Sequence, residues 1–297
     1  MTDQARLNES LKTLLAGRNA AVVPGAGNAL AARIAEDVGF EAIYVTGAGV
    51  TNSYLGAPDI GLLTMSELVQ HVATIRDAVS IPLIVDGDTG FGNAINVGRT
   101  VRAVERAGAS AIQIEDQEFP KKCGHFTGKE VIPAAEMAMK IRAAADARHD
   151  ANFQIIARTD AIACTGVEDA LERAMMYIEA GADVTFVEAP TSLAVMERIA
   201  RDLPVPQVAN LVAGGGLTPM ASTAELQRMG FGMVLYANAS LQAAMLAMQK
   251  VLSHLRQEGS LDGVADLLVD FKERQRLVRK PQYDADERRY EAATERS

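Results

Sequence analysis

One local pattern recurs along this chain: a helical run, then a glycine, then a short apolar strand. The copies lie at residues 34–45, 104–114, 177–187 and 226–236. Glycine suits the helix end because the backbone there turns into a left-handed conformation that most other residues avoid. The strands that follow are apolar without strict alternation, as expected of strands covered on both faces. The pattern therefore predicts αβ units of a parallel sheet.

Further strands complete the predicted sheet, at residues 21–24, 81–85, 153–157 and 206–209. Segments with helical spacing separate them, such as the one that contains Val97, Val101 and Val104. Alternating β and α units in a chain of this length favour an α/β fold, a closed (β/α)8 barrel of the TIM type. Periodicity alone also fits an open, doubly wound sheet.

The two ends of the chain differ from the predicted barrel. We expect residues 1–258 to form the barrel, with a leading helix at residues 7–15. Residues 259–297 are highly charged and carry apolar residues at near-helical spacing. Because a monomer has no use for that apolar stripe, we predict a C-terminal helical extension that packs on a neighbouring subunit.

Composition excludes several classes of partner. The chain has 297 residues and a net charge of −9, without a basic block in its body, which argues against nucleic acid and anionic membrane surfaces. No apolar run approaches the roughly 18 residues of a membrane span, so we expect a cytoplasmic protein. Its two cysteines, Cys123 and Cys164, exclude a disulfide framework and a thiolate zinc site.

Polar side chains gather where the predicted strands end. They are Thr46 after the second strand, Asp86 and Asp88 after the third, Glu115 after the fourth, Arg158 after the fifth, Glu188 after the sixth and Asn210 after the seventh. In a barrel the loops that follow the strands meet around one mouth, so these side chains are expected to converge. The convergence predicts a functional site at that end.

The carboxylates of this set favour a divalent metal. Asp86 and Asp88 are two residues apart, so on an extended chain they point the same way, and Glu115 comes from the adjacent strand. Carboxylates without histidine suit Mg²⁺ or Mn²⁺, held largely through water, better than zinc. The alternative is that Asp88 caps the next helix.

Arg158 and the segment Thr-Gly-Ala-Gly at 46–49 are candidates for holding an anionic substrate. A guanidinium at the end of an apolar strand can bind a carboxylate with two hydrogen bonds. Its alternative role is a buried ion pair with Glu188 or Asp160. The glycine-containing segment offers backbone N–H groups to an oxyanion, although a tight turn explains it equally well. It lacks the full dinucleotide fingerprint, so no nucleotide cofactor is required.

The segment after the fourth strand, residues 116–129, is long for such a connection and charged enough to serve as a lid. It contains Lys-Lys-Cys-Gly-His at 121–125, and the flanking cations would lower the thiol pKa of Cys123 and allow it to exchange protons near neutral pH. A free surface cysteine beside charges is the alternative. Cys164 lies among apolar residues and is interpreted as packing.

Together these stretches resemble the isocitrate lyase and phosphoenolpyruvate mutase superfamily, in particular its methylisocitrate lyase, dimethylmalate lyase and petal-death-protein-like branches. The resemblance runs from about the first strand to the last helix. Its specific elements are Tyr-Val-Thr-Gly at 44–47, Leu-Gly-Ala-Pro-Asp at 55–59, Asp-Gly-Asp-Thr-Gly-Phe-Gly at 86–92, Ile-Glu-Asp-Gln at 114–117, Lys-Lys-Cys-Gly-His at 121–125 and Ala-Arg-Thr-Asp at 157–160.

The resemblance implies a barrel whose last helix is swapped between subunits, usually a homotetramer. It implies Mg²⁺, bound directly by Asp86 and through water by Asp88, Glu115 and Asp59. The reaction implied is a retro-aldol cleavage of a carbon–carbon bond in a small di- or tricarboxylate, with Cys123 as the acid. The implied catalytic residues are Cys123, Tyr44, His125 and Glu188. The implied substrate-binding residues are Thr46, Gly47, Ala48, Lys121, Gly124, Arg158 and Asn210.

The chain departs from related lyases after Asn210. Where they carry a glutamate, this chain reads Leu-Val-Ala-Gly-Gly-Gly at 211–216, and Val212 and Ala213 remove polar groups that would help to seat a third carboxylate. We therefore favour a substituted malate of the 2,3-dimethylmalate type as the substrate. The alternatives are methylisocitrate cleavage, oxaloacetate hydrolysis or decarboxylation, and a catalytically silent barrel that acts as a binding protein.

Overall fold

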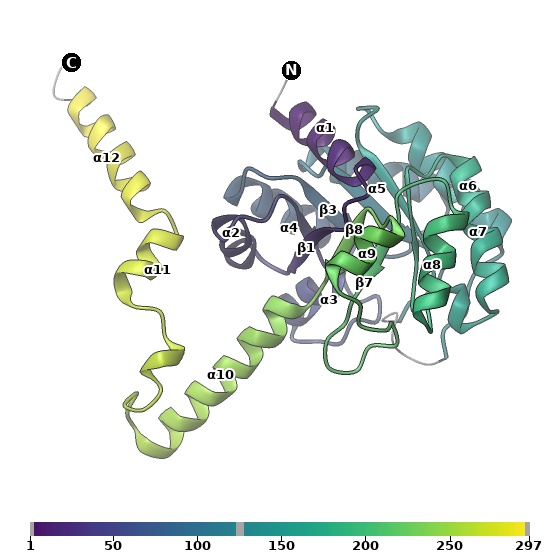
Figure 1. The fold of residues 1–297 in the computed structure, drawn as a ribbon. Coiled ribbons are helices and arrows are strands. Elements are labelled where there is room, and N and C mark those ends of the chain that lie inside the picture. The colour runs from purple at the N-terminus through teal and green to yellow at the C-terminus, as the bar shows by residue number, and fades with distance from the viewer. Residues whose placement is uncertain (1–2, 123–127, 295–297) are drawn as a thin grey trace. The chain divides into compact units, whose positions relative to one another are not determined.

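Eight parallel strands form the centre of the fold in the computed structural model, which describes residues 3–122 and 128–294 (Figure 1). They are β1 (Ala21–Ala26), β2 (Ile43–Val45), β3 (Leu83–Asp86), β4 (Ala111–Glu115), β5 (Gln154–Thr159), β6 (Val184–Val187), β7 (Val208–Asn210) and β8 (Met233–Tyr236). Each predicted strand overlaps one of these.

The strands follow one another around a nearly closed barrel. β1 to β6 pair in chain order, and β8 lies between β1 and β7. The remaining gap, between β6 and β7, is bridged by a parallel contact of Thr185 with Gln207, whose side chains share a hydrogen bond of 2.7 Å. A doubly wound sheet reverses its strand order at a switch point, and this order does not. The predicted barrel is therefore confirmed.

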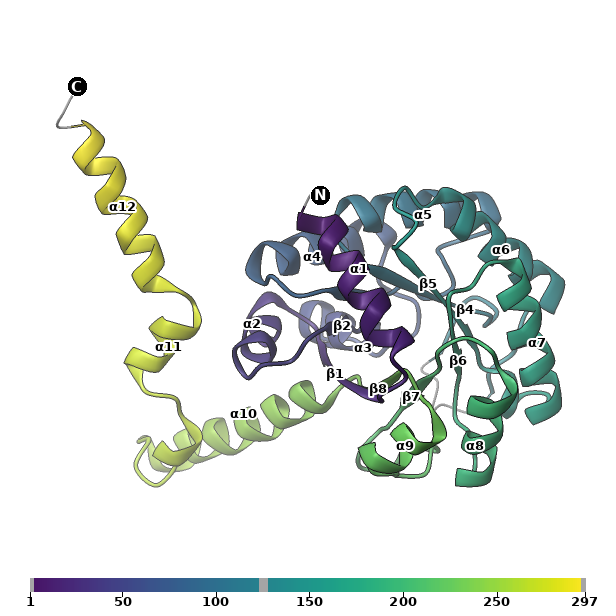
Figure 2. The same ribbon diagram turned by 45° about the horizontal axis from the view of Figure 1, so that its top comes forward.

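Helices surround the barrel and one helix closes its amino-terminal end (Figure 2). The outer helices are α2 (Ala29–Asp37), α4 (Met65–Ala78), α5 (Ala94–Arg106), α6 (Ala134–Ala147), α7 (Val167–Ala180), α8 (Leu193–Asp202) and α9 (Thr223–Met229). The leading helix α1 spans Asp3–Ala16, and its Leu11 and Leu15 pack with Val23 and Met233 inside the strand ring. The predicted leading helix is confirmed and is longer than expected.

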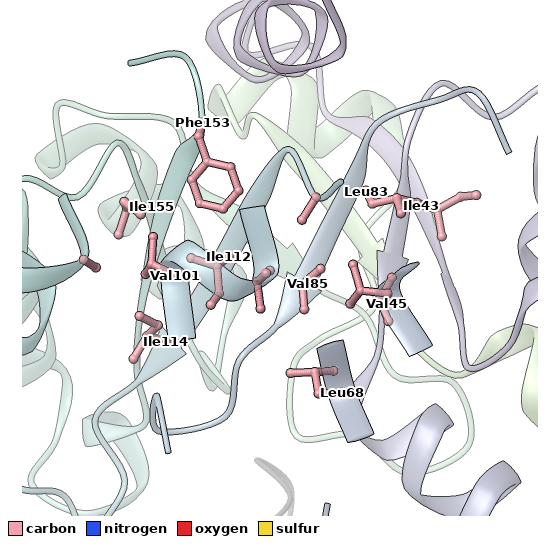
Figure 3. Packing of buried hydrophobic residues seen from close by; sticks show 14 of the residues in the cluster. Ile43, Val45, Leu68, Leu83, Val85, Val101, Ile112, Ile114, Phe153 and Ile155 are labelled. Atoms are coloured by element: carbon pink, nitrogen blue, oxygen red, sulfur yellow. The ribbon is translucent and has the colours of Figure 1, made fainter. Parts of the chain in front are cut away.

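Side-chain alternation along the strands separates two layers of the core. Ile112 and Ile114 of β4 point outward to the helices, where they pack with Val101 of α5 (Figure 3). Ala111 of the same strand belongs to the inner cluster. Because the side-chain period of a strand is two residues, Gln113 and Glu115 also face the inside. The same period brings the polar strand ends into the barrel mouth.

The rest of the chain forms a separate unit, residues 240–297. It comprises most of α10 (Ala239–Glu258), a short 3₁₀ turn, α11 (Phe271–Leu277) and α12 (Lys280–Thr294). α10 has no buried residue and exposes Met245, Leu246 and Leu252. The boundary falls at the start of α10, whereas we expected the extension to begin after its end. Within the described residues, no helix has both the length and the apolar character needed to cross a bilayer.

Candidate active site at the carboxyl ends of the strands

A cavity of about 230 Å³ lies at the carboxyl ends of the strands, and we call it the mouth cavity. Predicted site residues that line it are Tyr44, Thr46, Ala48, Asp59, Asp86, Glu115, Lys121, Arg158, Glu188 and Asn210. Larger hollows, such as one of about 780 Å³ beside α1, contain none of these residues. Cys123, Gly124 and His125 lie outside the described residues. The structure therefore brings most of the predicted site together at the expected place.

Asp86 is the last residue of β3 and is held by three donors. Its Oδ2 accepts the backbone N–H of Gly47 at 3.2 Å, and its Oδ1 accepts the N–H of Asp88 and the side-chain amide of Gln113, both at 3.3 Å. The carboxylate is thus fixed in direction before any ligand binds.

Asp88 reaches the site in a different way from the one we predicted. Its φ of 47° is left-handed, so the chain is not extended after Asp86, and the argument from strand geometry was wrong. The local turn instead directs the Asp88 carboxylate to the same space. Asp88 does not cap the next helix either, because Asn93 forms the capping box of α5. Burial raises the pKa of Asp88 to about 7, and Asp86 and Asp59 add to the rise while Lys121 opposes it.

Glu115 ends β4 with its carboxylate inside the barrel. Its buried Oε1 has no hydrogen-bond partner among residues 3–122 and 128–294, and burial raises the pKa of Glu115 well above its ordinary value. Burial of a carboxylate is unfavourable unless a cation or a hydrogen-bond donor pairs with it, so Glu115 is suited to bind a cation. We refer to Asp59, Asp86, Asp88 and Glu115 as the metal-side carboxylates.

The ammonium of Lys121 lies among the metal-side carboxylates. Its Nζ is 2.5 Å from Asp59 Oδ1 and 2.7 Å from Asp88 Oδ1. Burial alone would lower the pKa of Lys121, but the surrounding carboxylates raise it further than burial lowers it. Lys121, which we predicted to bind substrate, is therefore also the cation that balances these carboxylates.

The metal-side carboxylates fit a magnesium ion that keeps most of its water. In the described part of the chain, no three acidic, histidine or cysteine side chains converge closely enough to hold an ion by themselves. Magnesium does not require such a cage, because it dehydrates reluctantly and often takes one or two direct carboxylates. A Cβ added to Gly47 would lie 3.1 Å from Asp86 Oδ2 and 3.2 Å from Asp88 Oδ1, so glycine keeps this space open.

The predicted anion-binding turn is a short helix, α3 (Gly47–Val50). Thr46 caps it by accepting the N–H of Gly49, and the N–H of Gly47 points to Asp86. We had expected the Gly47 N–H to hold a substrate oxygen, and in this structure it holds a carboxylate of the protein instead. Ala48 lines the mouth cavity as expected.

Arg158 faces the metal-side carboxylates from β5. Its Nε lies 2.9 Å from Asp160 Oδ2, and its guanidinium also approaches Glu188 at 3.2 Å and Glu115 at 3.4 Å. It packs over the ring of Phe186 as well. The ion pairs that we gave as an alternative are present, and Arg158 still lines the mouth cavity. The two roles are therefore compatible.

Glu188 and Asn210 line the cavity next to Arg158. The amide nitrogen of Asn210 lies 3.2 Å from Glu188 Oε2, which leaves Glu188 between Asn210 and Arg158. Val212 lines the cavity next to them, whereas Ala213 is exposed. Of the two positions at which the sequence differs from related lyases, Val212 therefore lines the cavity and Ala213 does not.

Polar contacts of Lys129, Lys140 and Gln113 around the site were not predicted. Lys129 donates to Asp160 at 2.6 Å, Lys140 of α6 donates to the carbonyl oxygen of Thr89 at 3.2 Å, and Gln113 links Tyr44 to Asp86. Gln113 could have been found, because a polar residue inside an apolar strand at an inward position needs a partner. The lysines gave no such signal, because charged residues in loops and helices are usually solvated.

Cys164 does not have the packing role that we assigned to it. It is an exposed free cysteine whose thiol donates to the carbonyl oxygen of Lys129 at 3.4 Å. The pKa of this thiol is raised by partial burial.

Comparison with known proteins gives one consistent group of relatives. Residues 11–256 match the family model described as phosphoenolpyruvate phosphomutase. The chain is 45% identical to 2,3-dimethylmalate lyase of Eubacterium barkeri, over 89% of this chain and 91% of that one. It is 46% identical to 2-methylisocitrate lyase of Aeropyrum pernix, over 87% of this chain and 82% of that one.

Solved structures agree with this grouping. A 2,3-dimethylmalate lyase structure superposes with a TM-score of 0.88 at 33% identity, covering 96% of this chain and 95% of the other. Phosphonopyruvate hydrolase in complex with oxalate and Mg²⁺ superposes with a TM-score of 0.86 at 35% identity, covering 98% and 99%.

Proposed function

Because the chain belongs to the phosphoenolpyruvate mutase and isocitrate lyase superfamily, we propose that it is a Mg²⁺-dependent lyase that cleaves a substituted malate of the 2,3-dimethylmalate type. Its relatives in the 2,3-dimethylmalate lyase and 2-methylisocitrate lyase branch are carbon–carbon lyases. The observation that carries the proposal is that Asp59, Asp86, Glu115 and Arg158 line one small cavity, with the Asp88 carboxylate beside Asp86 and Lys121. A metal held by these carboxylates and a guanidinium in the same cavity suit a substrate with two carboxylates.

Asp86, Asp88, Glu115 and Asp59 would hold the metal. When bound, it would supply Lewis-acid chemistry that draws charge from the oxygens of the substrate. Arg158 binds the second carboxylate, and Asn210 and Glu188 hold the guanidinium side of the cavity in place. These contacts orient the bond between C2 and C3 of the substrate.

Cleavage is a retro-aldol step. The 2-hydroxyl group loses its proton to a base, the C2–C3 bond breaks, and C2 becomes the carbonyl carbon of a 2-oxo acid. The electron pair of the broken bond stays on C3 as an enolate of the carboxylate, which then takes a proton from an acid. From 2,3-dimethylmalate the products are pyruvate and propionate. We assign the final proton to Cys123, on the basis of the Lys-Lys-Cys-Gly-His segment and its resemblance to the lyases.

The size and chemistry of the cavity support a dicarboxylate over a tricarboxylate. Its volume is about 230 Å³, which suits a small ligand. Its wall at Val212 is apolar, so a third carboxylate placed there would lose its hydration without gaining a hydrogen bond. Val212 would instead contact a methyl substituent of the substrate.

A substrate comparison tests the assignment. The Mg²⁺-loaded enzyme is incubated separately with 2,3-dimethylmalate, methylisocitrate and oxaloacetate, and keto acid formation or loss is followed. We expect the highest kcat/KM for 2,3-dimethylmalate. A Val212→Thr variant, which places a hydroxyl group at the wall, should improve the relative rate with methylisocitrate. Turnover of none of the three would refute the lyase proposal.

We also propose that the chain assembles as a homotetramer through residues 240–297. The exposed apolar side chains of α10, with Leu261, Leu268 and Phe271 after it, need a covering surface. Light scattering of the full chain tests this, and a monomeric mass at micromolar concentration would contradict it.

A further inference from the structure

Gln113 connects Tyr44 to Asp86 inside the barrel. It occupies the middle of β4, and its backbone is in register with Asp86 on β3. The Tyr44 hydroxyl lies 2.6 Å from Gln113 Oε1, and Gln113 Nε2 lies 3.3 Å from Asp86 Oδ1. All three side chains are buried, and Gln113 has no exposed surface. Gln113 therefore makes both contacts from a position that is closed to solvent.

The chemistry of the three groups sets the direction of both hydrogen bonds. Asp86 Oδ1 already accepts the backbone N–H of Asp88, and the NH₂ end of the Gln113 amide faces the same oxygen as a second donor. The carbonyl end then faces Tyr44, and the phenol must donate to it. The single proton of Tyr44 is thereby committed to Gln113. Burial raises the pKa of Tyr44 well above its ordinary value, which keeps this proton on the phenol.

We propose that Gln113 is a positioning residue that orients Asp86 toward the metal, and that Tyr44 acts through Gln113 rather than as a proton donor to the substrate. The inference rests on the proposed metal site and assigns Tyr44 a role different from that in our sequence prediction. The backbone supports it, because the carbonyl oxygen of Gln113 also accepts the N–H of Gly87 at 2.8 Å. Gln113 thus contacts both the side chain of Asp86 and the turn that leads to Asp88.

Electron paramagnetic resonance measures Mn²⁺ binding to the protein directly. Because no substrate is present, the result tests this inference whether or not the proposed substrate is correct. Gln113→Met keeps a chain of similar length and removes the donor to Asp86. We expect a roughly tenfold loss of Mn²⁺ affinity, as is usual when a group that orients a metal ligand is removed. Mn²⁺ affinity equal to that of the wild type would overturn the proposal.

Tyr44→Phe removes only the hydroxyl group and provides the second variant, which decides the question even if Gln113→Met does not fold. We expect a weaker loss of Mn²⁺ affinity, because the Gln113 amide is then free to rotate. The double variant should bind Mn²⁺ no more weakly than Gln113→Met, because residues that act through one another are not additive. A Tyr44→Phe protein with unchanged Mn²⁺ affinity and lost turnover would show instead that Tyr44 acts on the substrate.

Gln207→Leu is the matched control. Gln207 is also a buried glutamine that accepts a hydroxyl hydrogen bond, from Thr185, but it lies at the gap between β6 and β7. Its replacement should lower thermal stability and leave Mn²⁺ affinity unchanged. An equal loss of Mn²⁺ affinity in this variant would mean that general loosening of the barrel, and not the contact with Asp86, explains the effect of Gln113→Met.

Discussion

The ammonium of Lys129 lies 2.6 Å from Oδ1 of Asp160, and both side chains are almost completely buried. The same carboxylate holds the guanidinium of Arg158. Arg158 therefore lies among three carboxyl groups, those of Asp160, Glu188 and Glu115. Lys129 adds a second cation to this group, and we expect it to help Arg158 to attract a carboxylate of the substrate.

Replacing Lys129 by methionine should weaken substrate binding. Without the ammonium, Asp160 opposes an incoming anion more strongly, so we expect KM to rise about tenfold while kcat changes less, a difference of about 1.4 kcal/mol in binding. The free energy of unfolding should also fall by about 3 kcal/mol, because the buried Asp160 has lost one of its two cationic partners. Steady-state kinetics and urea unfolding measure the two effects. Lys12→Met, at an exposed lysine that contacts Asn152, should change neither quantity.

The pH dependence of unfolding should also depend on the ion pair of Lys129 with Asp160. Burial by itself would raise the pKa of Asp160, but Arg158 and Lys129 together lower it below the ordinary value of 3.8. Because the pKa of Asp160 is lower in the folded than in the unfolded protein, its ionised form stabilises the fold above pH 3.8. This stability is lost as the pH falls from 3.8 through the pKa of Asp160 in the folded protein. In Lys129→Met the pKa of Asp160 rises, so this stability should be lost at a higher pH. Urea midpoints measured from pH 3 to pH 7 test this, and parallel curves for the two proteins would contradict it.

Lys121 should compete with the metal. Its ammonium already balances Asp59 and Asp88, so Lys121→Met leaves the metal-side carboxylates with more net negative charge. We expect Mn²⁺ to bind roughly tenfold more tightly, or about 1.4 kcal/mol, while turnover falls because the substrate loses a cationic partner. Calorimetry without substrate measures the affinity. Lys122→Met is the control, because its ammonium contacts the carbonyl oxygen of Gly128 instead of a metal-side carboxylate.

The sequence predicted those parts of the fold and of the site that follow from the side-chain periodicity of helices and strands. Asp86 and Glu115 end their strands, Arg158 is the last but one residue of β5, and Glu188 directly follows β6. A two-residue period places all four inside the mouth of a barrel. The same rule failed at Asp88, because a left-handed residue after the strand breaks the period.

Other features depend on contacts between distant segments that no local pattern encodes. Lys129 and Asp160 are 31 residues apart, and nothing in either neighbourhood indicates that the two are paired. The N–H of Gly47 bonds to Asp86 instead of remaining open to a ligand, which depends on how α3 and β3 pack. Cys164 lies among apolar residues in the sequence but on the surface in three dimensions.

The two cysteines should differ sharply in their effect on catalysis. Cys123→Ser should lower kcat by at least about 100-fold, the usual contribution of a positioned general acid, with little change in KM. Cys164→Ser provides a matched control, because the thiol of the exposed Cys164 donates to a backbone carbonyl oxygen. This variant should retain wild-type kcat. Rapid-quench measurement of a single turnover gives the rate of the chemical step. Equal rates in wild type and Cys123→Ser would remove Cys123 from the mechanism.

Proton nuclear magnetic resonance of the Mg²⁺-loaded enzyme with 2,3-dimethylmalate in D₂O tests the central claim most directly. Retro-aldol cleavage predicts equal amounts of pyruvate and of propionate that carries one deuterium at C2, with no reaction after treatment with EDTA. An unchanged substrate spectrum, release of carbon dioxide without propionate, or cleavage that persists in EDTA would contradict the assignment.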